Sequence, residues 1–435
     1  MNQFFKQNIP VFKFGGASVK DAEGIRNLQK IVTRYSGKPL FVVISAMGKT
    51  TNLLEKLLDA YFYGQEDPFV YFNQLRDNHF NVAHQLTDQN ERIIAKLTSV
   101  LKQLEEKLHT PHSDNYEYEY DQIVSFGEIL STKLISTYLN IVGIRNQWLD
   151  ARQVMITDST FMEAKIDWEA SEQALKDAIE AATAKKEENL FIIQGFIAGD
   201  KQGNATTFGR EGSDYSAAII AYILEAESVT IWKDVPGLLN ADPKFFPEAI
   251  KLEAISYEEA IELSYYGATI IHPKTLKPLQ NKKIPLYVKP FLSPDEAGSV
   301  ISSAKQKEFI PSYIFKRNQI LITIFPKDFS FISVENLSEI FAVLSANGLK
   351  INLMQNTALS FSICTDDKPH RIQKVLEALS KNYLIKYNEG MELITVRHYT
   401  DKIIHKVVGN RKIYAEQRTR TTMQVVVKGE ERQMA

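Results

Sequence analysis

The charged residues best suited to chemistry in this chain lie in two glycine-rich stretches. The first, residues 11–19 with the sequence VFKFGGASV, ends an apolar run in a lysine and two glycines. Gly15 and Gly16 allow a tight turn that brings backbone N–H groups close to an anion, and Lys13 adds positive charge there. Residues 21–23 then open a helical pattern, whose dipole would favour the same anion. The alternative is an ordinary strand-to-helix turn with a solvated lysine.

The second stretch, residues 206–216, has the sequence TTFGREGSDYS and precedes an apolar helical pattern. It places Arg210, Ser213 and Asp214 together at the start of a helix. Arg210 could clamp a carboxylate through two hydrogen bonds, and Asp214 could orient a lysine or hold Mg²⁺. A polar turn with a helix N-cap is the alternative, since Ser and Asp are favoured caps.

Six motifs in one order along roughly residues 10–300 resemble those of the aspartate kinase family, within the amino acid kinase superfamily. They read KFGG-[ST]-S-V, SA…TN, GE, GR-x-GSDY-[ST]-A, IW-x-DV-x-G and GA-x-x-[ILV]-HP, at 13–19, 45–52, 127–128, 209–217, 231–237 and 267–273. Six motifs in order are far more specific than one diglycine. The resemblance implies a monofunctional kinase, because no nicotinamide-binding domain follows within these 435 residues.

The resemblance also implies roles for the first glycine-rich stretch. Lys13 holds the transferring phosphoryl group, Asp214 orients Lys13, and Gly15, Gly16 and Ser18 add neutral donors to the ATP phosphates. Lys13 and Asp214 are the predicted catalytic residues. Phosphoryl transfer needs aligned reactants and neutralised charge more than covalent chemistry from the protein.

The acceptor half of the site follows from the same resemblance. Arg210 pairs with the α-carboxylate of aspartate and Glu128 takes its ammonium group, with Ser45, Thr51 and Ser213 beside the substrate. The β-carboxylate is then the nucleophile and needs no general base, because it is ionised at pH 7. Taken without the resemblance, Glu128 would be read as a solvated helix acid.

Residues 231–244 resemble the loop of the family that receives the adenine and ribose. The predicted ATP contacts there are Lys233, Asp234, Leu239, Asp242 and Lys244. An ordinary Pro-Gly turn describes the same backbone, and the two interpretations are compatible.

Three residues depart from the commoner family pattern. Lys233 stands where many relatives have threonine, Leu239 where many have an aromatic residue, and Thr269 where many have a second active-site lysine. We hypothesise that Lys233 supplies the charge missing at Thr269; the alternative is that it points to solvent or contacts only the ribose.

Two other nucleotide-binding motifs are excluded by spacing. Residues 48–50 read Gly-Lys-Thr, but the first glycine of a P-loop would fall at Val43, inside a strand. No GxGxxG is present, so a dinucleotide-binding fold is unsupported. The eight histidines show no HExxH spacing, His272 is more simply a turn residue, and no protein metal site is predicted.

Composition limits the remaining classes. The formal charge of −2 argues against a protein that binds nucleic acid or a membrane surface. The single cysteine, Cys364, excludes an internal disulfide and fits a reducing compartment. No apolar run approaches the ~20 residues of a membrane span, and residues 1–10 carry no signal sequence. We therefore expect a cytoplasmic protein.

Short apolar runs alternate with helical patterns up to about residue 300, which predicts an α/β fold with a mostly parallel sheet sandwiched by helices. The strands are expected at 11–14, 40–45, 190–193, 228–232 and 284–288. Residues 1–305 would form this catalytic domain, with a helical insertion at about 53–120 whose leucine row is core. Residues 114–121 are interpreted as a loop and 185–188 as a solvated helix end.

A boundary is expected at 305–311, where the composition turns polar. Beyond it the pattern predicts a β-α-β-β-α-β, ferredoxin-like order through residue 397, then a helix at 401–416 and a strand at 422–427. By resemblance, 312–435 is a regulatory region of ACT type, a small module that binds amino acids. The last 40 residues are short for a second module, which would be abbreviated or interleaved with the first.

These observations together predict ATP-dependent phosphorylation of L-aspartate to 4-phospho-L-aspartate, with Mg²⁺, in the biosynthesis of lysine, threonine and methionine. Two alternatives stay open: an amino acid kinase with another carboxylate acceptor, such as glutamate, and a non-catalytic amino-acid sensor built on a decayed kinase. Lysine or threonine is a possible effector, and a homodimer or higher homo-oligomer is expected.

Overall fold

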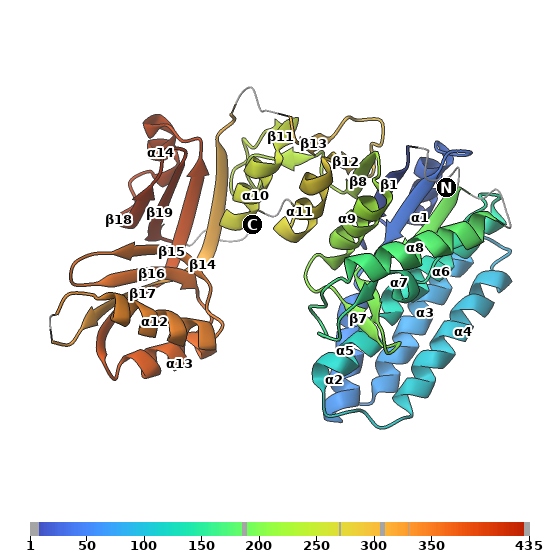
Figure 1. Ribbon diagram of the computed structural model, residues 1–435, viewed down its shortest axis with the longest axis horizontal. Helices are drawn as coiled ribbons and strands as arrows, with labels where there is room; N and C mark the ends of the chain where they lie inside the picture. The colour runs from blue at the N-terminus through green and yellow to red at the C-terminus, as the bar shows by residue number, and fades with distance from the viewer. Residues whose placement is uncertain (1–7, 185–188, 269–270, 305–308, 329, 430–435) are drawn as a thin grey trace. The chain divides into compact units, whose positions relative to one another are not determined.

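The computed structural model describes residues 8–184, 189–268, 271–304, 309–328 and 330–429 (Figure 1). The chain divides into two compact units: the first takes 1–238, 253–260 and 271–305, and the second takes 239–252, 261–270 and 306–435. Thr269 and residues 185–188 and 305–308 lie outside the described residues. In the described part of the chain, no helix is both long and apolar enough to span a membrane.

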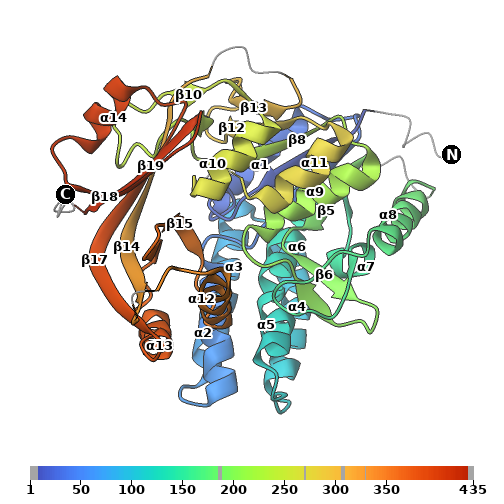
Figure 2. The ribbon, with the colours of Figure 1, turned by 60° about the vertical axis from the view of Figure 1, so that its left-hand side comes forward.

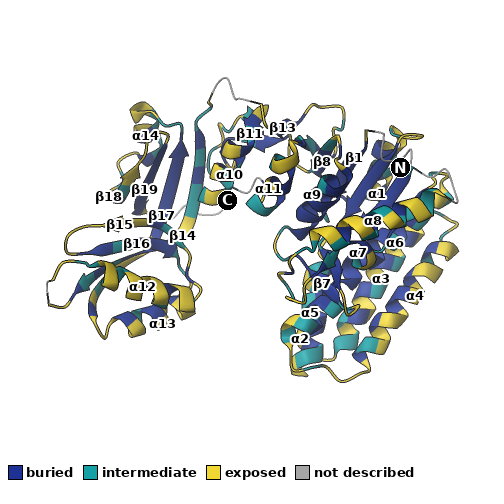
Figure 3. Ribbon diagram, in the orientation of Figure 1, coloured by how far each residue is buried: buried dark blue, intermediate teal, exposed yellow. Residues whose placement is uncertain are grey.

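The first unit is built on an eight-stranded sheet in the order β11-β13-β12-β8-β1-β2-β5-β3. Its strands are β1 (Pro10–Phe14), β2 (Leu40–Ile44), β3 (Gln147–Trp148), β5 (Leu190–Gln194), β8 (Ser228–Lys233), β11 (Ala254–Ser256), β12 (Leu286–Pro290) and β13 (Ser299–Ser302). All neighbours pair in parallel except β12 and β13. The central strands are buried along almost their whole length, as Figure 3 shows, which explains their continuous apolar runs.

Helices cover this sheet, as expected of a parallel α/β fold. Outside the helical insertion, the described helices that precede residue 283 are α1 (Ala22–Thr33), α6 (Phe126–Ile141), α7 (Ala151–Val154), α8 (Trp168–Thr183), α9 (Gly212–Leu224), α10 (Tyr257–Tyr266) and α11 (Pro273–Lys282). The almost wholly buried α9 packs on β1, β2 and β8, and α6 packs on β2, β3 and β5. A small sheet of β4 (Ile156–Thr157), β6 (Ile197–Asp200) and β7 (Ala205–Thr207) leads into α9.

The helical insertion consists of α2 (Thr50–Tyr63), α3 (Pro68–Leu86), α4 (Glu91–Leu108) and α5 (Tyr116–Val124). Together with α6 these helices run alongside one another (Figure 2). Leu97, Leu101, Leu104 and Leu108 are all buried, so the leucine row of α4 is core.

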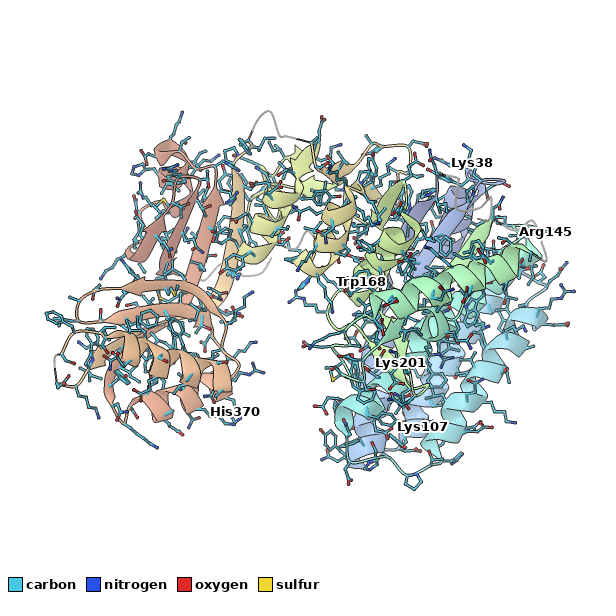
Figure 4. All side chains as sticks on the ribbon, in the orientation of Figure 1. Lys38, Lys107, Arg145, Trp168, Lys201 and His370 are labelled. Carbon is cyan, nitrogen blue, oxygen red and sulfur yellow. The ribbon has the colours of Figure 1, made fainter. Side chains whose placement is uncertain are left out.

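The expected loop at 114–121 is wrong, because most of it lies in α5. The Asn115 side chain caps the helix by accepting from the Tyr118 N–H at 3.0 Å. Two of the four acids in this segment, Glu119 and Asp121, are buried, and Glu119 pairs with Lys107 at 2.6 Å (Lys107 is labelled in Figure 4). A polar sequence can therefore form a partly buried helix when neighbouring elements supply its ionic partners.

The second unit contains a six-stranded antiparallel sheet in the order β15-β16-β14-β17-β19-β18. Its elements are β14 (Ser312–Pro326), α12 (Val334–Ala346), β15 (Ile351–Asn356), β16 (Phe361–Asp366), α13 (Pro369–Leu379), β17 (Tyr383–Arg397), α14 (Asp401–Val408), β18 (Ile413–Arg418) and β19 (Thr422–Lys428). A short hairpin of β9 (Leu238–Leu239) and β10 (Lys251–Leu252) precedes them in the chain.

The two long strands of this sheet, β14 and β17, each contribute residues to more than one hydrophobic core. The C-terminal half of β14 packs with α12, α13 and β16, whereas the C-terminal half of β17 packs with α14 and β19. The first half of β14, from Ser312, pairs with that second half of β17. The second set of elements is thus interleaved with the first rather than appended to it.

The predicted helix at 401–416 is wrong in its second half. Helix α14 ends at Val408, where Gly409 adopts φ +60°, and residues 413–418 form β18 on the edge of the sheet. Glycine ends a helix at little steric cost, and pairing with β19 then satisfies the backbone of the following residues.

Candidate active site

A cavity of about 610 Å³ opens at the carboxyl ends of four neighbouring parallel strands. Lys13, Ser45, Phe196 and Lys233 line it from β1, β2, β5 and β8 or the residues that follow them. Ligands of open α/β sheets bind at this edge, because the loops that leave the strands there can be shaped without disturbing the sheet.

A carboxylate with two lysines forms one side of the cavity. Lys13 Nζ lies 2.6 Å from Asp214 Oδ1, and Lys233 Nζ lies 3.9 Å from Asp214 Oδ2. Lys13 is 8% exposed and Asp214 4% exposed, so water screens this group weakly. Asp214 sits in the first turn of α9, near the positive end of the helix dipole. Among the described residues, two lysines thus share one carboxylate at this side of the cavity, and this arrangement favours an anionic ligand.

The diglycine turn brings the backbone close to the loop after β2. The Gly48 N–H donates to the Gly16 carbonyl at 3.0 Å, and a Cβ added to Gly16 would lie 2.7 Å from the Ala46 carbonyl. A side chain at residue 16 would therefore clash with backbone. The glycine is required by this close approach, which keeps the cavity floor open beside Lys13.

Glu128 is the second acid of the cavity, and it is buried without a cation in hydrogen-bond contact. Its Oε1 accepts from the Ala46 N–H at 3.2 Å, while its Oε2 has no hydrogen-bond partner among the described residues. Burial raises the pKa of Glu128 to about 8, against the opposing effects of the Ala46 N–H and the Lys13 charge. An unpartnered buried carboxyl costs stability, so its retention points to a cationic ligand group.

The loop before α9 supplies Arg210 and Ser213. Arg210 is exposed at the cavity, and the adjacent Glu211 adopts φ +56°, an uncommon conformation for a residue with a side chain. The Glu211 carboxylate accepts from the His272 N–H at 2.9 Å, which holds this turn. Ser213 packs against Gly195, where an added Cβ would lie 2.6 Å from the serine Cβ.

The structure brings together most of the residues predicted for the aspartate half. Lys13, Ser45, Thr51, Glu128, Arg210, Ser213, Asp214, Lys233 and Gly16 all line the cavity. Ser18 is buried, and its hydroxyl donates to the Trp232 carbonyl at 3.4 Å. Asp234 is exposed in the turn after β8. Leu239, Asp242 and Lys244 belong to the second unit, so their contact with ATP stays a prediction, as does that of Gly15.

Sequence reasoning missed several residues of the cavity wall, among them Tyr120, Met162 and Glu163. Tyr120 lies on α5, and its hydroxyl donates to Glu55 at 3.1 Å. The next residue, Asp121, accepts from the N–H groups of Met162 and Thr207 at 3.0 and 2.9 Å. The four acids of the tyrosine-rich segment 114–121 were the available signal, and the prediction of a loop there concealed it.

The described residues include no cluster of three or more His, Cys, Asp or Glu side chains that could hold a metal ion. The nearest acid to the lysine pair, Asp214, already contacts both lysines. This donor set fits Mg²⁺ carried mainly by nucleotide phosphates, which is a common way for proteins to use that ion.

The cavity thus lies at the carboxyl edge of a parallel sheet and is lined by two lysines, an arginine and a buried acid. Residues 8–290 match the model of the amino acid kinase family. The chain is 30% identical over 402 residues to lysine-sensitive aspartokinase 3 of Escherichia coli, covering 89% of this chain and 86% of that protein. It is also 30% identical over 421 residues to the chloroplastic aspartokinase 3 of Arabidopsis thaliana, covering 91% and 73%.

Solved structures agree with these sequence matches. E. coli aspartokinase III in complex with lysine and aspartate superposes with a TM-score of 0.80 at 27% identity, covering 97% of this chain and 96% of that one. The same enzyme with aspartate and ADP gives a TM-score of 0.80 at 26% identity. This chain belongs to the amino acid kinase family and, within it, to the aspartokinases, which phosphorylate a carboxyl group of aspartate.

Proposed function

We propose that the cavity transfers the γ-phosphoryl group of ATP to the β-carboxylate of L-aspartate, giving 4-phospho-L-aspartate, with Lys13, Asp214, Glu128 and Arg210 in the main roles. The observation that carries this proposal is that one cavity contains both a positively charged group and a negatively chargeable group. A carboxylate with two lysines offers positive charge to phosphate, and a buried acid without a cation offers negative charge to an ammonium group.

The lysine pair acts on the phosphoryl group. ATP and aspartate are both anions, so their repulsion must be offset where they meet. Lys13, fixed by Asp214 at 2.6 Å, stabilises charge on the transferring oxygens, and Lys233 adds the second cation. Because both are held before substrates arrive, little reorganisation is needed in the transition state.

Glu128 and Arg210 orient aspartate. The ammonium group replaces the missing partner of Glu128 Oε2, and Arg210 takes the α-carboxylate, so the side-chain carboxylate is directed toward the phosphoryl group. Ser45, Thr51 and Ser213 line the same cavity and complete the substrate contacts. The β-carboxylate attacks phosphorus as the ADP oxygen leaves, and no proton has to move because this acid is ionised at pH 7.

ATP enters with Mg²⁺, which supplies charge neutralisation between its phosphates. The N–H groups of Gly15 and Gly16 and the turn at Ser18 lie at the end of β1 beside Lys13. The residues Asp234, Leu239, Asp242 and Lys244 are proposed for the ribose and adenine end.

Regulation by an amino acid is part of the proposal. The similar E. coli enzyme is described as lysine-sensitive and was solved with lysine bound, which supports lysine as an effector here. The second unit, with residues 312–435, is the proposed regulatory region. Threonine as an effector, a homo-oligomer and a cytoplasmic location remain predictions from the sequence.

The test is a coupled assay of the full chain with ATP and Mg²⁺ against aspartate and glutamate, in wild type and Arg210→Lys. We expect turnover with aspartate, and an increase in KM for aspartate of about tenfold in Arg210→Lys with KM for ATP nearly unchanged, because lysine lacks the planar fork. Arg34→Lys is the matched control, since Arg34 pairs with Asp295 at the surface. Faster turnover of glutamate would favour another acceptor, and aspartate binding without turnover would favour a sensor.

A further inference from the structure

A second cavity, of about 230 Å³, lies wholly within the second unit and has no part in the proposed reaction. Its wall combines aromatic and charged side chains from the loop before β10 and from β14, β17 and α14. The lining residues are Phe245, Phe246, Pro247, Phe315, Arg317, Glu392, Lys406, Val407 and Arg411. An apolar cavity of about 150 Å³ is large enough for benzene, so this one has room for a ring with a short polar arm.

The charges of this cavity favour an anion. Glu392 is 6% exposed and pairs with Arg411 Nη1 at 2.6 Å, while Arg317 Nε lies 3.6 Å from its other oxygen. Lys406 pairs with Glu248. The described residues of the lining thus include three cations and one acid in a partly buried, aromatic setting.

Arg317 is the group able to receive that anion. Its guanidinium carbon lies 4.3 Å from the centre of the Phe245 ring, which covers one face of the planar group. Its contact with Glu392 is longer than a hydrogen bond, and its side chain has no hydrogen-bond partner among the described residues. A guanidinium held over a ring is restricted in its motion and can bind a carboxylate through two N–H groups.

The aromatic residues provide the matching apolar surface. Phe245 and Phe315 have ring centres 6.0 Å apart at 48°, and Phe246 stacks on Tyr313 at 4.6 Å. We infer that this cavity is a binding site for a small monocarboxylate with a flat apolar body, and that its occupancy regulates the kinase through the loop carrying Phe245 and Phe246.

The regulatory part rests on the proposed function, because Asp242 and Lys244 of this loop are proposed ATP contacts. Within the second unit the loop is held to β14 by the Phe245–Arg317 and Phe246–Tyr313 contacts, and the Tyr313 N–H donates to the Asn240 carbonyl at 2.7 Å. A ligand in the cavity that contacts Phe245 and Arg317 adds to the contacts that hold this arrangement of the loop. If ATP engages Asp242 and Lys244 in a different arrangement of the loop, its apparent affinity then falls.

The binding test uses 3-phenylpropanoate as the probe and the uncharged 3-phenylpropanamide as its control, with the full chain. We expect the acid to raise Tm by about 2–5 °C at saturation, and the amide to have little effect. Arg317→Gln should abolish the shift, whereas Arg371→Gln, on α13 and bonded to the Gly348 carbonyl, should retain it. If Arg317→Gln destabilises the fold, Val407→Phe fills the cavity without removing a charge and should also abolish the shift.

The kinetic test measures KM for ATP with and without the acid. An increase of about fivefold in wild type, absent in Val407→Phe, is expected. Equal Tm shifts with the acid and the amide would contradict the proposed binding site. A Tm shift that persists in both Arg317→Gln and Val407→Phe would also contradict it. A Tm shift without any change in KM for ATP would overturn the regulatory part. Tm is read without catalysis, so absence of aspartate kinase activity would refute the proposed function and leave the binding result intact.

Discussion

Two buried glutamates, one in each unit, differ in whether the surrounding residues pair their charge. Glu128, 3% exposed, accepts one backbone N–H and leaves Oε2 without a hydrogen-bond partner among the described residues. Glu392, 6% exposed, has Arg411 at 2.6 Å and Arg317 at 3.6 Å. The Glu392 carboxylate is neutralised by cations of the fold. The Glu128 carboxyl group either pairs with a cation from a ligand or stays protonated.

This contrast separates a binding site from structural ion pairing. A fold minimises its free energy by pairing buried charges, as it does around Glu392. Where it leaves a buried acid without a cation, the stability lost is recovered only when a ligand arrives, and the ligand's affinity contains that recovered energy. The predictions below test this distinction.

The largest effect is expected for Lys13→Ala. The variant removes the cation that Asp214 holds at 2.6 Å, and its charge is needed most when the phosphoryl group moves. We expect kcat to fall by about 10²–10³ or more, with the fold intact. Steady-state kinetics and circular dichroism check this, with the exposed Lys20→Ala as control. A near-normal kcat would remove Lys13 from the catalytic role.

Glu128→Gln should weaken aspartate binding and stabilise the protein. Gln keeps an acceptor for the Ala46 N–H but cannot pair with an ammonium group, so KM for aspartate should rise by roughly 10–100-fold. The pKa of Glu128 is about 8 in the fold and near 4.5 when unfolded. Its protonation therefore favours the fold fully below pH 4.5, and this contribution is lost as pH rises to 8.

The stability difference between Glu128→Gln and wild type should accordingly grow with pH. We expect the variant to be more stable at pH 8 by roughly 2–4 kcal/mol, and by little at pH 4.5. Urea unfolding at the two pH values measures it. A variant that is less stable at pH 8 would mean that Glu128 has a cationic partner in the fold, and the contrast with Glu392 would fail.

Lys233→Thr tests whether Lys233 supplies the second phosphate charge. Because Lys233 Nζ lies 3.9 Å from Asp214, we expect about a tenfold loss in kcat/KM for ATP. Adding Thr269→Lys should restore part of the loss. A double-mutant cycle measures this coupling, and additive effects would indicate independent sites. Wild-type behaviour of Lys233→Thr would end the hypothesis.

The smallest catalytic effect is expected for Glu392→Gln. The variant leaves Arg317 and Arg411 without their acid, so the free energy of unfolding should fall by roughly 1–3 kcal/mol. We expect kcat to change less than about twofold, since the residue lies in no described part of the active site. Denaturation and kinetics of one preparation give both values. A large loss of kcat with normal stability would give Glu392 a functional role.

The strands of the catalytic sheet were predicted well from the sequence because each has a local sequence signal. Apolar runs followed by glycine or polar residues marked β1, β2, β5 and β8, and the same boundaries carry Lys13, Ser45 and Lys233. Family resemblance then predicted the substrate contacts Ser45, Thr51, Glu128, Arg210 and Ser213, which the structure places in one cavity, while their roles stay predictions. The resemblance does not predict how far a side chain is buried. Nothing in the sequence around Glu128 distinguishes an acid that faces solvent from a buried acid without a partner.

The misses share a physical cause, which is contact with residues distant in sequence. Helix α5 is polar in sequence and is buried because Lys107 and Thr207 satisfy Glu119 and Asp121. Strand β18 exists because β19 pairs with it. Local periodicity does not contain such information, so the loop assigned to residues 114–121 hid Tyr120, which lines the cavity.

The single cysteine of the chain gives the second unit a chemical reporter of its own. Cys364 is fully buried on β16, and burial raises the pKa of its thiol to about 12. A thiol reagent should therefore modify the protein only as fast as this strand is exposed by opening. The labelling rate would report the opening of one unit while turnover reports the other, and lysine or a carboxylate bound to the second unit should slow labelling without any engineered probe.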